Sequence, residues 1–363
     1  MLDKLTVVLI TYNRHTYLAR TIDYWKNINV NLLILDGSAT SFDSQYIPKT
    51  SLAKIKYIHY PYSLNARLKH SLSFIKTEYI LLASDDEYFL PAGINDCIKF
   101  LDNKPDYISC IGRTLAFNIE NNNIVLWPEY EDMNGYEVDS NNPFMRMFSH
   151  MGEYTCNTIF SVVRSKDWKV AINIITSYNY NVYSIQEYQF ENVISFLGKS
   201  KVINSLMWLR NQENPSLYKN TQIELFYKWW KLNRYKSQRD HFIEIQVSKI
   251  VEYKNCNKEK LRNAIKLSYD MFLNWYKFTY PIPNFKQDLY NYLVFHFPLK
   301  YKKYIFKFRF LYKWFKSNKP LVITEHYTFN SILIYLSTNN IAFNFEDLKD
   351  AIISLNKFHK INE

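Results

Sequence analysis

The sequence predicts an α/β fold with a mostly parallel sheet, followed by a mainly helical region. Four apolar runs of strand length alternate with helical patterns over the first 90 residues, and each run ends in a polar turn. Strands joined by helices are parallel, so their polar turns meet at one edge of the sheet. After residue 214 the composition changes and helical periodicity continues to the end. We therefore expect two domains, over residues 1–214 and 215–363.

The first half of the α/β domain follows from its apolar runs. Strands are predicted at 5–10, 32–35, 55–59 and 79–83, with amphipathic helices after the first and third. Because each polar turn lies at a carboxyl end, the side chains of these turns converge on one crevice.

The second half contains three further apolar runs. They predict strands at 105–117, 158–164 and 202–209, with an apolar-faced helix before the last strand. The polar and aromatic stretch 118–142 is predicted to be an irregular loop beside an acceptor pocket.

Two adjacent acids, Asp85 and Asp86, follow the fourth strand in the stretch YILLASDDEYFLP. Neighbouring carboxylates repel unless a cation neutralises them, and oxygen ligands with room for water suit Mg²⁺ or Mn²⁺. Such an ion would hold the diphosphate of a nucleotide. The alternative is a strand-ending turn in which the aspartates cap the next helix.

Four motifs occur in order at these strand ends: Thr-Tyr-Asn at 11–13, Asp-Gly-Ser at 36–38, Asn-Ala-Arg at 65–67 and Ser-Asp-Asp-x-x-x-x-Pro at 84–91. Together they resemble inverting family-2 glycosyltransferases with the GT-A fold, over roughly residues 3–212. The spore-coat polysaccharide synthase type is the most similar. Two positions depart from the family pattern. Leu35-Asp36 stands where the family has two acids, and Ala83 stands where the first metal-motif acid is expected.

The resemblance implies a nucleotide-sugar site. Thr11 and Tyr12 would bind the nucleotide, with Tyr12 stacked on the base and Asp36 accepting a hydrogen bond from it. Arg67 would reach the base or the diphosphate, as an aromatic face suits a base and a guanidinium suits phosphate. The alternatives are a half-buried turn tyrosine and a solvated helix arginine.

The same resemblance assigns the two acids. Asp86 would hold the metal, and Asp85 would contact the ribose or support the metal indirectly.

The second half supplies the predicted catalytic base. Gln186-Glu187 occupies the place of a Glu-Asp pair in the family, so Glu187 is the candidate, with Asp132 and Glu153 in reserve. Inverting transfer needs one carboxylate beside the acceptor hydroxyl. A glutamate near a helix N-terminus is also favoured by the helix dipole alone. Arg210, which closes the last strand, would bind the diphosphate or pair with a surface acid.

Composition excludes several other classes. The six glycines form neither G-x-G-x-x-G nor G-x-x-x-x-G-K, which argues against a Rossmann dinucleotide enzyme and a P-loop NTPase. The four cysteines are dispersed and predict buried thiols in a reducing cytoplasm (Cys97, Cys110, Cys156, Cys256). No uncharged apolar stretch reaches 18 residues, and the first apolar run is too short for a signal peptide, so no spanning helix is expected.

The formal net charge of +11 accompanies a Lys-, Asn-, Ile-, Tyr- and Phe-rich composition that is typical of A/T-rich genomes. Because no RNA- or DNA-binding motif appears, nucleic acid is not an expected partner.

The stretch 300–319 contains eight Lys or Arg residues, and no acid lies between Asp288 and Glu325. On a helical wheel it has a broad apolar arc and a second aromatic stripe of Phe306, Phe310 and Trp314. This composition predicts a helix on an anionic membrane surface. A second packing face inside a helical domain is the alternative.

These observations predict a metal-dependent inverting glycosyltransferase of bacterial type, using Mn²⁺ or Mg²⁺. It would transfer a sugar from a nucleotide-diphosphate sugar, with UDP as the expected nucleotide, to a surface glycan or lipid-linked glycan. It would act in the cytoplasm, with contact to the inner face of the membrane. The alternatives are a catalytically inactive nucleotide- or glycan-binding module and a nucleotidyltransferase. The latter usually needs a Gly-rich basic first loop, which residues 11–14 lack.

Overall fold

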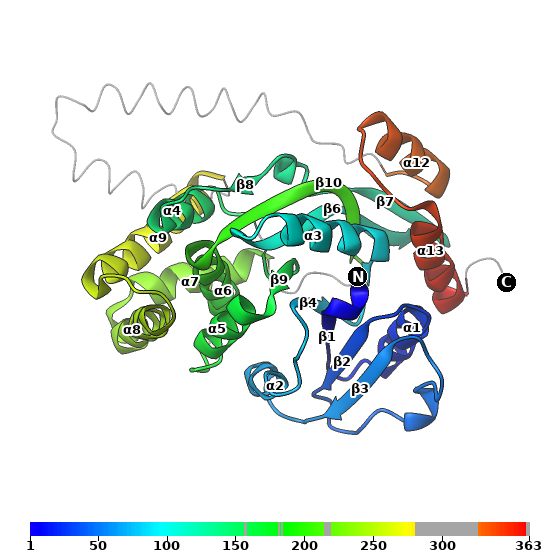
Figure 1. Ribbon diagram of the computed structural model, residues 1–363, viewed down its shortest axis with the longest axis horizontal. Coiled ribbons are helices and arrows are strands. Elements are labelled where there is room, and N and C mark those ends of the chain that lie inside the picture. The colour runs from blue at the N-terminus through cyan, green and yellow to red at the C-terminus, as the bar shows by residue number, and fades with distance from the viewer. Residues whose placement is uncertain (156–157, 181, 183, 214–218, 280–325, 361–363) are drawn as a thin grey trace.

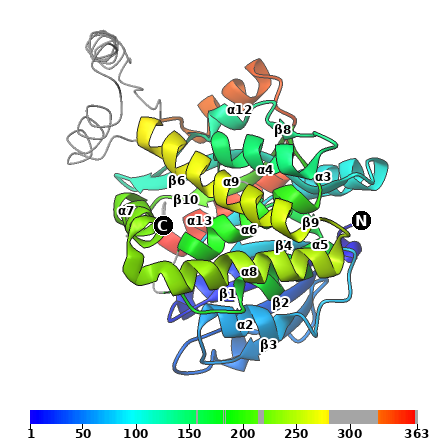
Figure 2. The ribbon, with the colours of Figure 1, turned by 90° about the vertical axis from the view of Figure 1, so that its left-hand side faces the viewer.

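The computed structural model describes residues 1–155, 158–180, 182, 184–213, 219–279 and 326–360. A ten-stranded sheet runs through the molecule, and helices cover both of its faces (Figures 1 and 2). Buried apolar side chains form one cluster on each face of the sheet. The predicted α/β class, with a sheet between helices and helices in the C-terminal region, is confirmed.

The central strands follow the order β3-β2-β1-β4-β9-β6-β10-β5, while β7 pairs with β6 and β8 with β10. The first four strands are parallel, as predicted, and they are in register. Thr11 lies opposite Asp36, and Asp36 lies opposite His59, so these strands end at one edge. The strands are β1 (Leu5–Thr11), β2 (Asn31–Asp36), β3 (Lys54–His59), β4 (Tyr79–Ser84), β5 (Tyr88–Phe89), β6 (Tyr107–Glu120), β7 (Asn123–Glu129), β8 (Glu137–Val138), β9 (Val162–Arg164) and β10 (Lys199–Asn211).

The other half of the sheet mixes strand directions. Strands β6 and β10 are parallel to each other, and the short β9 runs antiparallel between β4 and β6. Strand β9 therefore links the parallel strands β1 to β4 to the mixed half of the sheet. Its three residues are fewer than the predicted strand at 158–164.

The prediction of an irregular loop over residues 118–142 is wrong for residues 118–129. These residues belong to the hairpin of β6 and β7. Glu120 pairs with Asn123, which leaves only Asn121 and Asn122 in the turn. Both have positive φ, 49° and 60°. A two-residue hairpin turn needs this backbone geometry, and asparagine adopts it more readily than most residues.

The helices lie in two layers beside the sheet and in one group at its far end. The sequence elements that start them are local: Ser63 caps α2 by accepting a hydrogen bond from the Ala66 N–H, and Pro91 begins α3. The helices are α1 (His15–Trp25), α2 (Leu64–Ser71), α3 (Pro91–Asn103), α4 (Pro143–Gly152), α5 (Ser165–Ile175), α6 (Ser184–Leu197), α7 (Lys219–Lys231), α8 (Lys236–Tyr253), α9 (Lys258–Thr279), α12 (Phe329–Thr338) and α13 (Phe345–His359), with short 3-10 turns at Leu2–Lys4 (η1), Ser44–Tyr46 (η2), Glu131–Met133 (η3) and Asn233–Tyr235 (η4).

The helices after residue 219 pack on the sheet domain at two separate places. Helices α7, α8 and α9 share an apolar cluster with α4, α5 and α6, and Figure 2 shows α8 and α9 lying over them. Helices α12 and α13 pack instead on β6, β7 and β10, at the other end of Figure 1. The predicted division at residue 214 stays a prediction, but the described helices beyond it share their cores with the first domain.

Some predictions fall outside the described residues, including the basic stretch 300–319 and Cys156. Cys97 and Cys110 are buried free thiols, as expected, whereas Cys256 is free but only partly buried, so the prediction is wrong for it. Within the described ranges, none of the helices combines the length and the apolar character that crossing a membrane requires.

Candidate active site

The turn after β1 carries the candidate site, and its backbone is held against the turn after β2. Asn13 has a φ of 55°, a left-handed conformation that asparagine tolerates. Its N–H donates to Ser38 Oγ at 2.8 Å, and its side chain accepts from the Ala39 N–H at 3.4 Å. The chain then enters α1, with Arg14 as its N-cap residue. This turn directs the Arg14 side chain toward the end of β4.

Asp85 and Asp86 share one guanidinium. Arg14 contacts Asp85 Oδ1 at 3.2 Å with one terminal nitrogen and Asp86 Oδ2 at 2.8 Å with the other. The remaining oxygens also accept hydrogen bonds: Asp85 Oδ2 from Thr11 Oγ1 at 2.6 Å, and Asp86 Oδ1 from Ser84 Oγ at 2.8 Å. The predicted repulsion between the acids is therefore offset by a cation of the chain itself. No sequence motif marks Arg14, although a basic residue directly after β1 is a usable signal.

Two acids at this strand end, Asp85 and Glu87, have raised pKa values. Burial raises the pKa of Asp85 to about 6, although Arg14 and Thr11 lower it. Burial, with the charge of Asp86, raises the pKa of Glu87 to about 8, against the influence of Arg210 and of the Trp208 indole. The side chain of Asp86 is 14% exposed and that of Asp85 3%. Of the predicted pair, Asp86 is thus the one open to a ligand.

Asp36, at the end of β2, is buried and already bonded. It accepts from the Ser38 N–H at 2.8 Å and from Tyr57 Oη at 2.7 Å, and His15 Nε2 lies 3.4 Å away. Burial opposes ionisation, but these bonds outweigh it and keep the pKa of Asp36 below its ordinary value. Its charged carboxylate lies at the predicted edge, where it holds the β2 turn in shape.

Arg67 braces the same crevice from α2. One terminal guanidinium nitrogen donates to the backbone oxygens of Thr11, at 2.7 Å, and Leu35, at 2.9 Å. A Cβ on Gly37 would lie only 2.5 Å from the guanidinium carbon, so glycine is needed for this close approach. The glycine of the Asp-Gly-Ser motif therefore has a steric reason.

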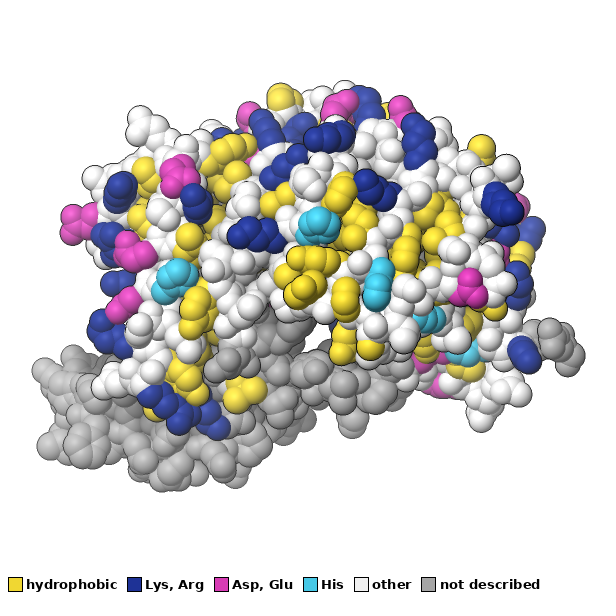
Figure 3. Space-filling view, turned by 90° about the horizontal axis from the view of Figure 1, so that it is seen from below, with side chains coloured by type: hydrophobic (Ala, Val, Ile, Leu, Met, Phe, Trp, Pro, Cys, Tyr) yellow, Lys and Arg dark blue, Asp and Glu magenta, His cyan; other side chains and the backbone are white. Residues whose placement is uncertain are grey.

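Tyr12 is 60% exposed, as a residue that stacks on a ligand must be. Tyr62, after β3, has the same exposure. Figure 3 shows hydrophobic side chains, tyrosines included, and histidines spread over the face seen from below, where Figure 1 places α2 and β3.

Glu187 lies in the first turn of α6 and lines a cavity of about 550 Å³. Ile10 and Leu82, just before the ends of β1 and β4, line it too, as does Asn65. Tyr154 Oη donates to Glu187 Oε1 at 3.0 Å. The candidate base thus opens into a cavity that begins at the same strand ends as the acids.

A buried carboxylate that the sequence analysis missed supports this cavity. Glu191, one turn after Glu187, accepts from the N–H groups of Thr158 and Ile159 at 2.9 and 3.0 Å, and from His150 Nε2 at 2.8 Å. It thereby fixes the segment whose Ile159 and Phe160 line the cavity. No motif marks Glu191, since its partners are distant in sequence.

The remaining candidates have structural partners. Arg210 donates to Glu129 at 2.7 Å, and its guanidinium carbon lies 5.2 Å from the Tyr130 ring centre. Asp132 accepts from Thr155 at 3.4 Å. Glu153 is the C-cap residue of α4, which ends at Gly152. Arg210 still lies close enough to oppose the raised pKa of Glu87, which places its charge near the acids.

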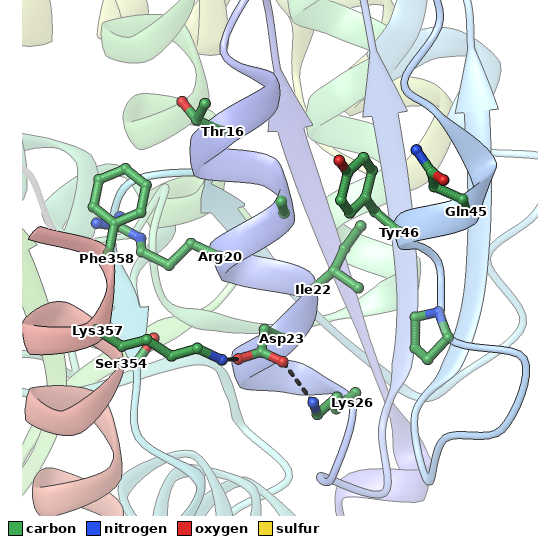
Figure 4. A pocket seen from close by; sticks show the side chains of 12 residues that line it. Thr16, Arg20, Ile22, Asp23, Lys26, Gln45, Tyr46, Ser354, Lys357 and Phe358 are labelled. Atoms are coloured by element: carbon green, nitrogen blue, oxygen red, sulfur yellow. Dashed lines mark hydrogen bonds and ion pairs between the residues drawn. The ribbon is translucent and has the colours of Figure 1, made fainter. Parts of the chain in front are cut away.

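A second cavity, of about 530 Å³, lies between α1, η2 and α13 (Figure 4). Asp23 pairs there with Lys26 at 2.5 Å and with Lys357 at 3.1 Å. Arg20 spans from α1 toward α13, and its buried guanidinium makes no hydrogen bond to the described residues. Three aromatic rings surround that guanidinium (Tyr17, Tyr88 and Phe358). None of the predicted site residues lines this cavity, so we place the active site at the strand ends.

Asp85 and Asp86 could bind a divalent cation only if Arg14 moved. Asp86 offers hard oxygen ligands at a strand end, but Arg14 must first break its contact with Asp86 Oδ2. Arg14 is 33% exposed and can do so. In the part of the chain that the structure describes, no group of three or more His, Cys, Asp or Glu side chains is arranged to hold a metal. Water and a ligand would have to complete the coordination.

Part of this chain matches a known protein family, and its fold aligns with solved structures. Residues 6–160 match the model of the family Glycosyl transferase family 2. No curated protein sequence matches the chain. Among solved structures, Staphylococcus aureus TarS 1–349 aligns with 12% identity and a TM-score of 0.49, covering 82% of this chain and 76% of that one. The same protein with UDP-GlcNAc aligns at 13% and 0.49, over 82% and 77%. The matched residues 6–160 include Thr11, Asp36, Arg67, Asp85 and Asp86, so the family match covers the crevice at the strand ends.

Proposed function

We propose that the protein is an inverting glycosyltransferase that takes a sugar from a nucleotide-diphosphate sugar, with UDP as the expected nucleotide. One observation carries the proposal: an exposed tyrosine, a buried charged aspartate and an acid pair meet at one sheet edge, within the family match. Ligands of open α/β sheets bind at this edge. The finer similarity to the spore-coat polysaccharide synthase type belongs to this proposal.

Each residue has a proposed role at the donor. Tyr12 stacks on the base, while Asp36 and Arg67 shape the crevice that receives it. Asp86, with Asp85 beside it, would hold Mn²⁺ or Mg²⁺, which would neutralise charge on the departing diphosphate. Arg210 adds positive charge on the same side.

Glu187 is the proposed general base. It lies in a cavity that begins at the strand ends, and its contact with Tyr154 orients it. The acceptor hydroxyl would enter this cavity and lose its proton to Glu187 as its oxygen attacks the sugar carbon, while the nucleotide diphosphate leaves from the opposite face.

The acceptor is proposed to be a bacterial surface glycan such as capsule, lipooligosaccharide or O-antigen, or its lipid-linked precursor. The transferred group would be a hexosyl or N-acetylhexosaminyl unit. Transfer would take place in the cytoplasm, at the inner face of the membrane.

A screen of nucleotide sugars tests the function. Thermal shift with and without Mn²⁺ should single out one nucleotide, with UDP expected, and transfer of a labelled sugar should follow with a glycan acceptor. Binding without transfer or hydrolysis would favour an inactive binding module. Absence of binding to every nucleotide sugar would overturn the proposal.

A further inference from the structure

Arg14 occupies the carboxylates to which the proposed function assigns the metal. Its two terminal nitrogens lie 3.2 Å from Asp85 and 2.8 Å from Asp86, so one rigid fork spans both acids. Each acid also has its second oxygen bonded inside the protein, to Thr11 and Ser84. Every carboxylate oxygen of the pair therefore has a partner in the free protein.

A divalent cation cannot join this arrangement without changing it. Asp86 Oδ2 is the oxygen nearest Arg14, and a cation there would stand beside a guanidinium that is always charged. Asp85 is too buried to serve alone, with 3% of its side chain exposed. Metal binding thus requires Arg14 to move, and one-third of its side chain is exposed, which leaves it room.

A diphosphate provides the reason for Arg14 to move. Guanidinium groups bind phosphate through the same two-pronged geometry that they use for carboxylates. The Tyr17 ring, whose centre lies 4.3 Å from the Arg14 guanidinium carbon, borders the side chain on α1. A donor bound at the ends of β1 and β4 would bring its phosphates to the exposed side of this group.

We propose that Arg14 blocks the metal carboxylates of the free protein and transfers to the diphosphate when the donor binds. Metal and nucleotide then bind cooperatively, because the nucleotide removes the competing cation. This inference rests on the proposed function for its ligand, but it concerns a residue to which the family match assigns no role. The coupling is reciprocal: the factor by which the nucleotide strengthens metal binding equals the factor by which the metal strengthens nucleotide binding.

Metal affinity in the absence of nucleotide gives the direct test. Mn²⁺ binding to the full chain is measured by electron paramagnetic resonance, for wild type and for Arg14→Gln, without and with UDP. Wild type should bind Mn²⁺ weakly alone, and UDP should strengthen that binding by about 5- to 150-fold, the usual range of such coupling. Arg14→Gln should bind Mn²⁺ alone at least about tenfold more tightly, with a smaller gain from UDP.

Two variants serve as controls. Arg234→Gln makes the same change in η4, within the helical group of α7 and α8, and should leave Mn²⁺ binding unchanged. Arg14→Lys keeps the charge but loses the fork, so its Mn²⁺ affinity should lie between wild type and Arg14→Gln. Circular dichroism melting verifies that each variant folds, and Arg14→Lys carries the test if Arg14→Gln does not.

The outcomes separate this inference from the proposed function. If UDP and Mn²⁺ bind wild type together but the Arg14 variants leave Mn²⁺ affinity unchanged or weaker, the blocking role is wrong and the glycosyltransferase proposal stands. If the variants bind Mn²⁺ more tightly but no nucleotide diphosphate binds, Arg14 blocks the site and the proposed donor is wrong.

Discussion

At the scale of single residues, the proposed metal site depends on Asp86. It is the more exposed member of the pair and follows a buried strand that fixes its position. Asp86→Ala should abolish the Mn²⁺-dependent part of UDP binding, as measured by calorimetry with and without the metal. Asp106→Ala, at a side chain that is 76% exposed and outside the site, is the matched control. Unchanged metal dependence in Asp86→Ala would remove the assignment.

Glu187 can be tested without changing its shape. Glu187→Gln should retain donor affinity and lose turnover by about 10²-fold or more, because the amide cannot accept the acceptor proton. Single-turnover rates and UDP titration measure the two effects separately. If transfer continues near the wild-type rate while Asp132→Asn abolishes it, Asp132 is the base instead.

The raised pKa of Asp85 predicts that the folded protein becomes less stable as the pH rises. Its pKa is about 6 in the folded protein and about 3.9 in an unfolded chain, so between these values the native state binds the proton more strongly. Asp85 therefore lowers stability as the pH rises from about 4 to 6, and the cost is complete above 6. Asp85→Asn should gain stability relative to wild type over this interval, by up to roughly 3 kcal/mol. Urea unfolding at pH 4 and pH 7 measures it; an equal difference at both pH values would contradict the pKa.

Single residues also show where sequence reasoning ends. Asp86 and Glu187 are candidates in the sequence because each stands at a recognisable element boundary, and their roles stay predictions. The position of Arg14 directly after β1 was a usable signal, but its partner Asp86 lies 72 positions away. Glu191 had no such signal, because its contact with Thr158 spans 33 positions of sequence. Such contacts exist only once the strands and helices are assembled.

At the scale of elements, apolar periodicity was a sound guide for β1, β2 and β4, which are buried runs with polar ends. It also found β3, whose residues are exposed or half-buried. It was a poor guide for β7, whose residues are mostly half-buried and whose presence depends on the Asn121-Asn122 turn. The packing of α13 on β6 and β7 could not be predicted either, because no local signal specifies which surface an amphipathic helix covers.

Helix α13 should unfold together with the sheet. Leu348 is fully buried in the cluster that also contains Leu115 and Leu209 of the sheet. Leu348→Ala should lower the free energy of unfolding by about 2–5 kcal/mol while unfolding remains one transition. Ile353→Ala, at a position of the same helix that is 51% exposed, should change it by less than about 0.5 kcal/mol. A separate early transition in calorimetry would show that α13 belongs to an independent unit.

At the scale of the whole molecule, the positive net charge bears on the proposed lipid-linked acceptor. The net charge is +11, and eight basic residues lie between Lys300 and Lys319, in a stretch outside the described residues. An enzyme that uses lipid-linked acceptors gains by staying at the anionic surface that holds them. The composition of this stretch therefore predicts contact with an anionic membrane.

The full chain should therefore sediment with phosphatidylglycerol vesicles at low salt. Each Lys or Arg near anionic lipid contributes about 1 kcal/mol, and salt screens this part of the binding. Insertion of Phe306, Phe310 and Trp314 would contribute a part that salt does not remove. Changing these three to Ser should leave binding that high salt abolishes, whereas wild type should be retained in part. If wild type stays in the supernatant at low salt, the aromatic residues belong to a protein core, and the triple variant should then show a lowered melting temperature.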